Sequence, residues 1–254
     1  MRTMSHTLFA AVAATLVVSV FPAAAPAQQQ PAGTTRYYVQ VVRLKPEMAN
    51  DWMEVQKNEV IPAQKKAGVA SRMTLATVVG NAFEYTMITP LPTWASFDGP
   101  APLTRALGEA GAASVNAKLR KCIMTQTSYI STRLDDLGMP GGDALVARVV
   151  VRRAMPGKMQ DYLSYYKAEV MPALQKAKAD GKIAGFGISR RGAGALSNEF
   201  TTVTYYTKFA DLDNMSPVAY ALGQEAADKV NDKAALFSTS NQVVIRRRVA
   251  DLSF

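Results

Sequence analysis

The residues of this chain that are best suited to chemistry are arginines, tyrosines and a glutamine on predicted strands. Guanidinium groups donate paired hydrogen bonds to carboxylates, and tyrosine rings offer an aromatic face with a polar tip. Together they predict a binding site for a small anionic or aromatic molecule. Its expected ligand-binding residues are Tyr38, Gln40, Arg72, Tyr85, Tyr129, Arg148, Arg152 and Arg246.

The histidine and cysteine content excludes several other kinds of site. The 254 residues include one histidine, His6, and one cysteine, Cys122. His6 lies in a segment that we expect to be removed, which would leave no histidine for a catalytic triad, a zinc site or a proximal haem ligand. A single cysteine forms neither an internal disulfide nor a thiolate cluster. We therefore expect no metal and no cofactor, and we identify no catalytic residue. A haem held by tyrosine is the alternative that stays open.

The first 27 residues have the pattern of a secretory signal peptide. Arg2 precedes an apolar run from Leu8 to Phe21, and small residues follow up to Ala27. This run of about 14 residues is shorter than the roughly 20 that a membrane-spanning helix needs. We expect cleavage after Ala27, a flexible lead-in over 28–35, and a soluble periplasmic or secreted product. Retention of the segment as a membrane anchor is the alternative.

The remainder of the chain contains an internal repeat. The segment KNEVIPA at 57–63 recurs as KAEVMPA at 167–173, 110 positions later. Further along, Ala-Leu-Gly at 106–108 matches Ala-Leu-Gly at 221–223, and the matches keep their order from end to end. We predict a first unit at 36–134, a turn-rich linker at 135–143 and a second unit at 144–254.

Each unit reads as strand, helix, strand, strand, helix, strand. In the first unit the strands are expected near 36–44, 71–79, 82–89 and 124–133, and in the second near 144–153, 184–191, 199–207 and 239–248. The first helix of each unit opens at Pro46 or Pro156 and contains Pro62 or Pro172, where we expect a kink or a break. A second helix is expected near 102–118 and 217–236. This order is the ferredoxin-like unit, an α+β fold.

The element order, with a first helix that ends in Glu-Val-x-Pro, resembles the dimeric α/β-barrel superfamily. That group includes NIPSNAP-like proteins, antibiotic-biosynthesis-type monooxygenases, small haem-degrading monooxygenases and chlorite-dismutase-like proteins. The resemblance implies that the two tandem ferredoxin-like units form a single-chain version of the dimer. It also implies a pocket between sheet and helices in each unit, or in the barrel between the two sheets. The haem members use a histidine that the mature chain would lack.

The repeat also predicts which strand faces point into the barrel. Val39 and Val41 recur as Val149 and Val151, and a face that stays apolar in both copies is expected to pack on the helices. The eight candidate ligand-binding residues would then face the barrel. In an alternative interpretation the tyrosines only fill volume, and the arginines pair with carboxylates of Glu84, Glu199, Asp135 or Asp136.

Two further features favour structural roles. Glu59 and Glu169, which recur in the repeat, are expected to be lysine partners near a helix end, with acid catalysis as the alternative. Cys122 is expected to be a small core residue, because its counterpart is Phe237. The basic run at 246–248 would divide between two strand faces, so we expect no nucleic-acid partner.

Two classes of function fit these observations. The first is an exported protein of the cell envelope that binds a small anionic or aromatic ligand in the barrel. The second is an enzyme, a cofactor-independent monooxygenase or isomerase-like protein acting on a small aromatic or polyketide-like molecule. The lack of a paired acid and base favours binding. The expected partners are a small-molecule ligand and, at most, a second barrel, since the chain should be a monomer or a dimer of barrels.

Overall fold

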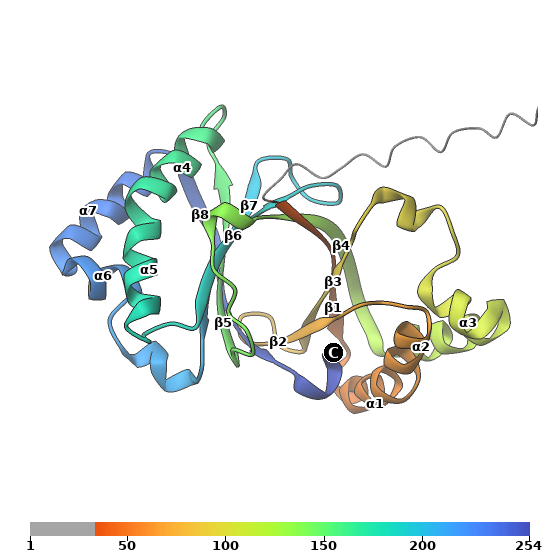
Figure 1. The fold of residues 1–254 in the computed structure, drawn as a ribbon. Coiled ribbons are helices and arrows are strands. Elements are labelled where there is room, and N and C mark those ends of the chain that lie inside the picture. The colour runs from red at the N-terminus through yellow and green to blue at the C-terminus, as the bar shows by residue number, and fades with distance from the viewer. Residues whose placement is uncertain (1–33) are drawn as a thin grey trace, which may run out of the picture.

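The computed structural model describes residues 34–254 of the chain. The predicted signal peptide and all but the end of the predicted lead-in therefore lie outside the described residues. The described part is an α+β fold in which eight antiparallel strands close into a barrel. Helices cover the barrel on two opposite sides, with α1 to α3 on one side and α4 to α7 on the other (Figure 1). The prediction of an α+β barrel is confirmed.

The element order in each half is the predicted one. The first half consists of β1 (Thr34–Leu44), α1 (Ala49–Val55), α2 (Ile61–Lys66), β2 (Met73–Val79), β3 (Glu84–Pro90), α3 (Pro102–Cys122) and β4 (Ile123–Leu134). The second half consists of β5 (Val146–Ala154), α4 (Met159–Tyr165), α5 (Met171–Ala179), β6 (Gly185–Arg191), β7 (Glu199–Tyr206), α6 (Pro217–Leu222), α7 (Gln224–Ala235) and β8 (Ser238–Arg248).

The strands of the two halves are arranged in the same way around the barrel. The first half contributes the order β4-β1-β3-β2 and the second half the order β8-β5-β7-β6. The halves meet at two short junctions. At one of them 75–79 of β2 pairs with 245–248 of β8, and at the other 131–133 of β4 pairs with 189–191 of β6. The pairing of β1 with β4 is much longer and runs from Thr34 to Leu44.

The first helix of each half passes its proline without a break. A π-helical turn, Gln56–Val60 or Tyr166–Val170, joins α1 to α2 and α4 to α5, and the proline is the second residue of the helix that follows. A π turn shifts the backbone hydrogen bonds by one residue, so it can accommodate a position that lacks an N–H. The expected kink or break is replaced by a widened turn at the same position of each half.

A glycine divides the second helix of each half. Gly108 has φ of 72° inside α3, and Gly223 has φ of 83° between α6 and α7. Side chains rarely adopt this left-handed conformation, whereas glycine adopts it freely. The conserved spacing of Ala-Leu-Gly in the repeat thus marks a turn in the helical layer of both halves.

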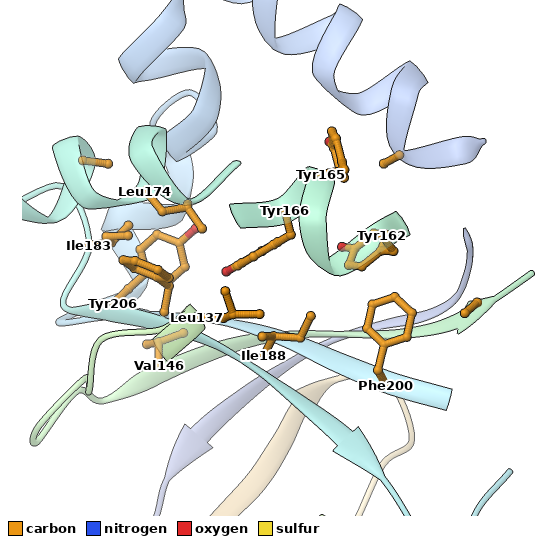
Figure 2. Close-up of a cluster of buried hydrophobic side chains, with 14 residues drawn as sticks. Leu137, Val146, Tyr162, Tyr165, Tyr166, Leu174, Ile183, Ile188, Phe200 and Tyr206 are labelled. Atoms are coloured by element: carbon orange, nitrogen blue, oxygen red, sulfur yellow. The ribbon is translucent and has the colours of Figure 1, made fainter. Parts of the chain in front are cut away.

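The apolar core has three parts. One lies between α4, α5 and the second-half sheet, and it contains Tyr162, Tyr166 and Phe200, which converge from helix and strands in Figure 2. A second part surrounds Trp52 in the first half. The third part, which includes Leu75, Val149 and Val244, fills the interior of the barrel, here called the lumen.

Candidate functional site

The faces of β1 and β5 are opposite to those predicted. Val39 and Val149 border the lumen, and Val41 lines its other end. The prediction failed because these strands are buried on both faces, one against the helices and one inside the closed barrel. An apolar face therefore does not show which side it covers. The polar positions between the valines face the helices.

The predicted ligand-binding residues are consequently divided among three places. Tyr129 and Arg246 border the lumen, as predicted. Tyr38 and Tyr85 point to the first-half helices, where Tyr38 packs edge-on against Phe97 and the Tyr85 ring lies 4.8 Å from that of Trp52. The other members of the set are assigned as follows: Gln40 borders a first-half cavity, Arg148 and Arg152 a second-half pocket, and Arg72 both the lumen and the first-half cavity. The expectation of one barrel site containing all eight is wrong.

Two arginines inside the barrel, Arg246 and Arg191, are held by carboxylates, as the structural alternative predicted. Arg246 Nη2 lies 3.2 Å from Glu84 Oε1, and both side chains are about nine-tenths buried. Arg191 Nη1 lies 3.5 Å from Glu199 Oε2, and its guanidinium group also stacks over the Tyr129 ring at 4.6 Å. Burial lowers the pKa of Arg246, and the nearby Glu84 acts in the opposite direction.

Other predicted structural roles are also confirmed. Glu59 accepts from Lys118 at 2.8 Å, and Glu169 forms the equivalent ion pair with Lys233. Both pairs lie at the surface and join the first helix of a half to the second. Cys122 is buried with 2% exposure.

A pocket of about 530 Å³ lies between the second-half sheet and its helices. Arg148, Val150 and Arg152 of β5 form part of the strand side. Tyr162 and Tyr165 of α4 and Tyr166 of the π-helical turn form the helix side. Alternate residues of a strand point to the same face, which explains why the two arginines enter the pocket together. The tyrosines follow the 162, 165, 166 spacing of a helix face.

Both arginines of this pocket lack an ionic partner. Within residues 34–254, neither Arg148 nor Arg152 lies in ion-pair contact with a carboxylate. The acidic residue that lines the pocket, Asp211, is already engaged by the Thr207 hydroxyl at 2.8 Å and the Lys208 backbone N–H at 3.2 Å. The Arg152 guanidinium lies over the Tyr162 ring at 5.9 Å. The pocket therefore presents uncompensated positive charge beside an aromatic wall.

Two buried polar atoms of the pocket are also unpartnered. Arg152 Nε and Tyr166 Oη have no hydrogen-bond partner in the described part of the chain. Burial raises the pKa of Tyr162, Tyr165 and Tyr166, so all three phenols are neutral near pH 7 and can donate hydrogen bonds. Tyr165 uses its hydroxyl to donate to the Val230 carbonyl at 2.6 Å. The buried Tyr166 hydroxyl is a donor that no group of the described residues uses.

The three tyrosines were not among the predicted site residues. Their sequence positions fit a core stripe equally well, and Figure 2 shows the Tyr162 ring beside Phe200. The Tyr165 ring packs on the other side, against Phe237. The sequence feature that distinguishes them from ordinary core residues is their number of hydroxyl groups. Three phenols within five positions need more hydrogen-bond partners than an apolar core usually provides.

The pocket residues do not fit a haem. The described residues contain no histidine, since His6 is the single one in the chain. A tyrosine ligand would have to bind iron as a phenolate, and burial of Tyr162, Tyr165 and Tyr166 disfavours that charged form. No group of three or more potential metal ligands occurs within the described segment.

Comparison with known proteins shows similarity at the level of fold. No protein-family model matches the chain, and no curated protein matches it. Several solved structures do. A candidate monooxygenase from Lactobacillus acidophilus matches with a TM-score of 0.53 and 9% identity, over 87% of this chain and 95% of that one. A candidate monooxygenase from Fusobacterium nucleatum matches with a TM-score of 0.54 and 9% identity, over 86% of this chain and 94% of that one.

Two further structures extend the comparison. An anthrone oxidase-like protein matches with a TM-score of 0.51 and 9% identity, over 85% of this chain and 91% of that one. A chlorite dismutase variant from Candidatus Nitrospira defluvii matches with a TM-score of 0.51 and 9% identity, over 88% of this chain and 93% of that one. The chain has the dimeric α/β-barrel fold. The matches do not single out NIPSNAP-like proteins. At identities this low, the matches establish the fold and do not establish an activity.

The helices of this dimeric α/β barrel are short or polar. Among the helices of the described residues, none combines the length and the apolar character needed to cross a bilayer.

Proposed function

We propose that the second-half pocket of this protein binds a small aromatic carboxylate. The observation that carries the proposal is the pair Arg148 and Arg152, which enter a tyrosine-lined pocket and have no carboxylate partner within residues 34–254. Arg152 is half-buried, and an anion would stabilise its charge, whereas Arg148 is exposed at the border of the pocket. A planar carboxylate matches the fork of a guanidinium group. Aromatic rings of the ligand would pack on Tyr162 and Tyr166.

The proposal is tested with 2-naphthoate as the probe. We expect Arg152→Gln to weaken its binding by about tenfold or more, since a charge-assisted hydrogen bond contributes about 1.5–3 kcal/mol. Isothermal calorimetry gives the dissociation constants. Arg153→Gln is the matched control, because Arg153 carries the same charge at the adjacent position and pairs with Glu199 at 3.4 Å. Equal binding by Arg152→Gln and the wild type would refute the proposal.

An enzymatic role for the same pocket is the second candidate. Arg152 Nε and the neutral Tyr166 hydroxyl are unpartnered donors within the described chain, and such donors stabilise negative charge that develops on an oxygen atom. This favours a cofactor-independent monooxygenase or isomerase acting on an aromatic or polyketide-like molecule. The names of the anthrone oxidase-like protein and the candidate monooxygenases support this direction. Recording oxygen uptake during the probe titration separates monooxygenation from binding.

We also propose that the protein is exported, as the pattern of residues 1–27 predicts. The expected mature chain then begins at Gln28 and carries a formal net charge of +8. Intact-mass measurement of protein expressed in a Gram-negative host, with the periplasmic fraction prepared separately, tests this. A full-length chain found in the membrane fraction would instead support an anchor. Substitution of Ala27 by a bulky residue should block cleavage, because the peptidase requires small side chains there.

The two halves are further proposed to be tandem ferredoxin-like units that arose by duplication. Support comes from the ordered sequence matches, the identical strand order and the π-helical turn and glycine break found at equivalent positions.

A further inference from the structure

We propose that the first half of the chain carries a second, chemically distinct binding site, which takes a small carboxylate that bears hydroxyl groups. The site is a cavity of about 310 Å³ between the first-half sheet and its helices. It is bordered by β1 and β4 on the sheet side and by α1, α2, α3 and the π-helical turn between α1 and α2 on the other. It is separate from the second-half pocket and shares no residue with it.

Three residues that border this cavity each carry an unpartnered buried atom. Trp52 Nε1, Gln56 Oε1 and Arg72 Nη2 all lack a hydrogen-bond partner within residues 34–254. The three side chains come from α1, the π-helical turn and the segment before β2, and they are exposed by only 0%, 4% and 2%. A buried polar atom without a partner costs free energy that a suitable ligand recovers. Two of these atoms donate and one accepts, so the ligand needs acceptor atoms and at least one hydroxyl or N–H donor.

Arg72 provides the positive charge of the site. Its Nε donates to Thr74 Oγ1 at 3.1 Å and its Nη1 donates to Gln64 Oε1 at 3.2 Å, and both acceptors are neutral. Burial lowers the pKa of Arg72 to about 10, so the group is still charged at neutral pH. No aspartate or glutamate lines the cavity, whereas the exposed Arg120 of α3 adds a second cation to its border. A carboxylate on the ligand would provide the missing counter-charge.

The remaining polar lining favours hydroxyl groups. Besides Gln56 and Gln64, the cavity is bordered by Gln40 of β1, Gln126 of β4 and Asn116 of α3. Each amide offers both a donor and an acceptor, which is the combination that a hydroxyl group matches. The rest of the lining is apolar and includes Val42, Trp52 and Met87.

The repeat shows that the two sites are equivalent in position and different in chemistry. At the offset of 110, Gln40, Gln56 and Gln64 correspond to Val150, Tyr166 and Leu174 of the second-half pocket. Amides in one half therefore stand where apolar and aromatic side chains stand in the other. A ligand suited to one site is poorly suited to its counterpart, so the halves hold different molecules.

Calorimetric titration of the whole protein with D-gluconate tests the site. Gluconate combines a carboxylate with hydroxyl groups. D-Glucitol keeps the hydroxyls and lacks the charge, whereas hexanoate keeps the charge and lacks the hydroxyls. We expect gluconate to bind and the other two to bind at least about tenfold more weakly, as the loss of a charge-assisted hydrogen bond implies. Absence of gluconate binding up to millimolar concentrations, or equal binding of all three probes, would overturn the proposal.

Two substitutions assign the binding to this cavity. Gln56→Leu keeps the size of the side chain and removes the unpartnered acceptor, and Arg72→Met removes the charge. We expect each to weaken gluconate binding by about tenfold or more. The thermal midpoint of Gln56→Leu should be unchanged or raised, because an unpaired buried oxygen is lost. Gln224→Leu on the exposed surface of α7 is the matched control and should bind as the wild type does. Unchanged binding in a folded Gln56→Leu variant would place the ligand elsewhere and refute the assignment.

Because this titration uses a non-aromatic probe, its outcome is independent of 2-naphthoate binding in the second half. Failure of one proposal leaves the other standing.

Discussion

Replacement of Glu84 by alanine is expected to lower the free energy of unfolding by about 3–5 kcal/mol, the cost of leaving a buried charge without its partner. Glu84 and Arg246 are exposed by only 8% each, and their contact of 3.2 Å joins β3 to β8 past the intervening strand β2. The Arg246 Nε already lacks a partner within the described residues, so loss of the carboxylate would leave the guanidinium group more poorly compensated still. Denaturation by urea, followed by circular dichroism, measures the change.

Two controls show whether the cost arises from the unpaired charge. The double variant Glu84→Leu/Arg246→Met should recover most of the lost stability, because apolar side chains of similar volume can replace a buried ion pair. Glu225→Ala, which removes a surface pair with Lys229, should change the unfolding free energy by at most about 0.5 kcal/mol. A double variant no more stable than Glu84→Ala would contradict this explanation.

Phe200→Ala is expected to have a comparably large effect, with a loss of about 3–5 kcal/mol of unfolding free energy. The Phe200 side chain is completely buried, and its ring centroid lies 4.5 Å from that of Tyr162 (Figure 2). The substitution removes apolar contacts and leaves a cavity beneath the helix that carries the tyrosine wall. The same urea denaturation reports the loss.

A surface substitution provides the comparison for Phe200. Leu236 is 64% exposed, so Leu236→Ala should alter stability by only about 0.5 kcal/mol. If the loss in Phe200→Ala were no greater than that in Leu236→Ala, the packing of β7 against α4 would be weaker than the structure indicates.

The sequence alone predicted the element order well, because the internal repeat shows the same pattern of elements in both halves. The match between 57–63 and 167–173 identified the first helix of each half as equivalent. The match between Gly108 and Gly223 identified an equivalent turn in the helical layer. The strand faces could not be predicted in the same way. Val39 and Val149 are apolar in both copies, yet a strand buried on both sides carries no sign of which apolar face meets the helices. Closure of the barrel depends on pairing between β2 and β8, which no local pattern reveals.

The candidate site was predicted only in part. Arg148 and Arg152 were selected by their chemistry and do border a pocket, but they face the helices and not the lumen. Arg246 was selected for the same reason and forms an ion pair with Glu84. What distinguishes a free arginine from a paired one is the position of a carboxylate far away in the sequence. That position depends on the tertiary structure, and local sequence patterns do not contain it.

The two short junctions between the halves are the places where the strand pairing of the barrel can open most easily. Opening at 131–133 and at 75–79 would break a few ladder hydrogen bonds, whereas separation of β1 from β4 would break many. Amide protons at these junctions should therefore exchange with solvent through smaller fluctuations than those of β1. Such a motion would separate the two four-stranded sheets at their junctions while each sheet stays intact. Water would then reach the otherwise buried Glu84 and Arg246.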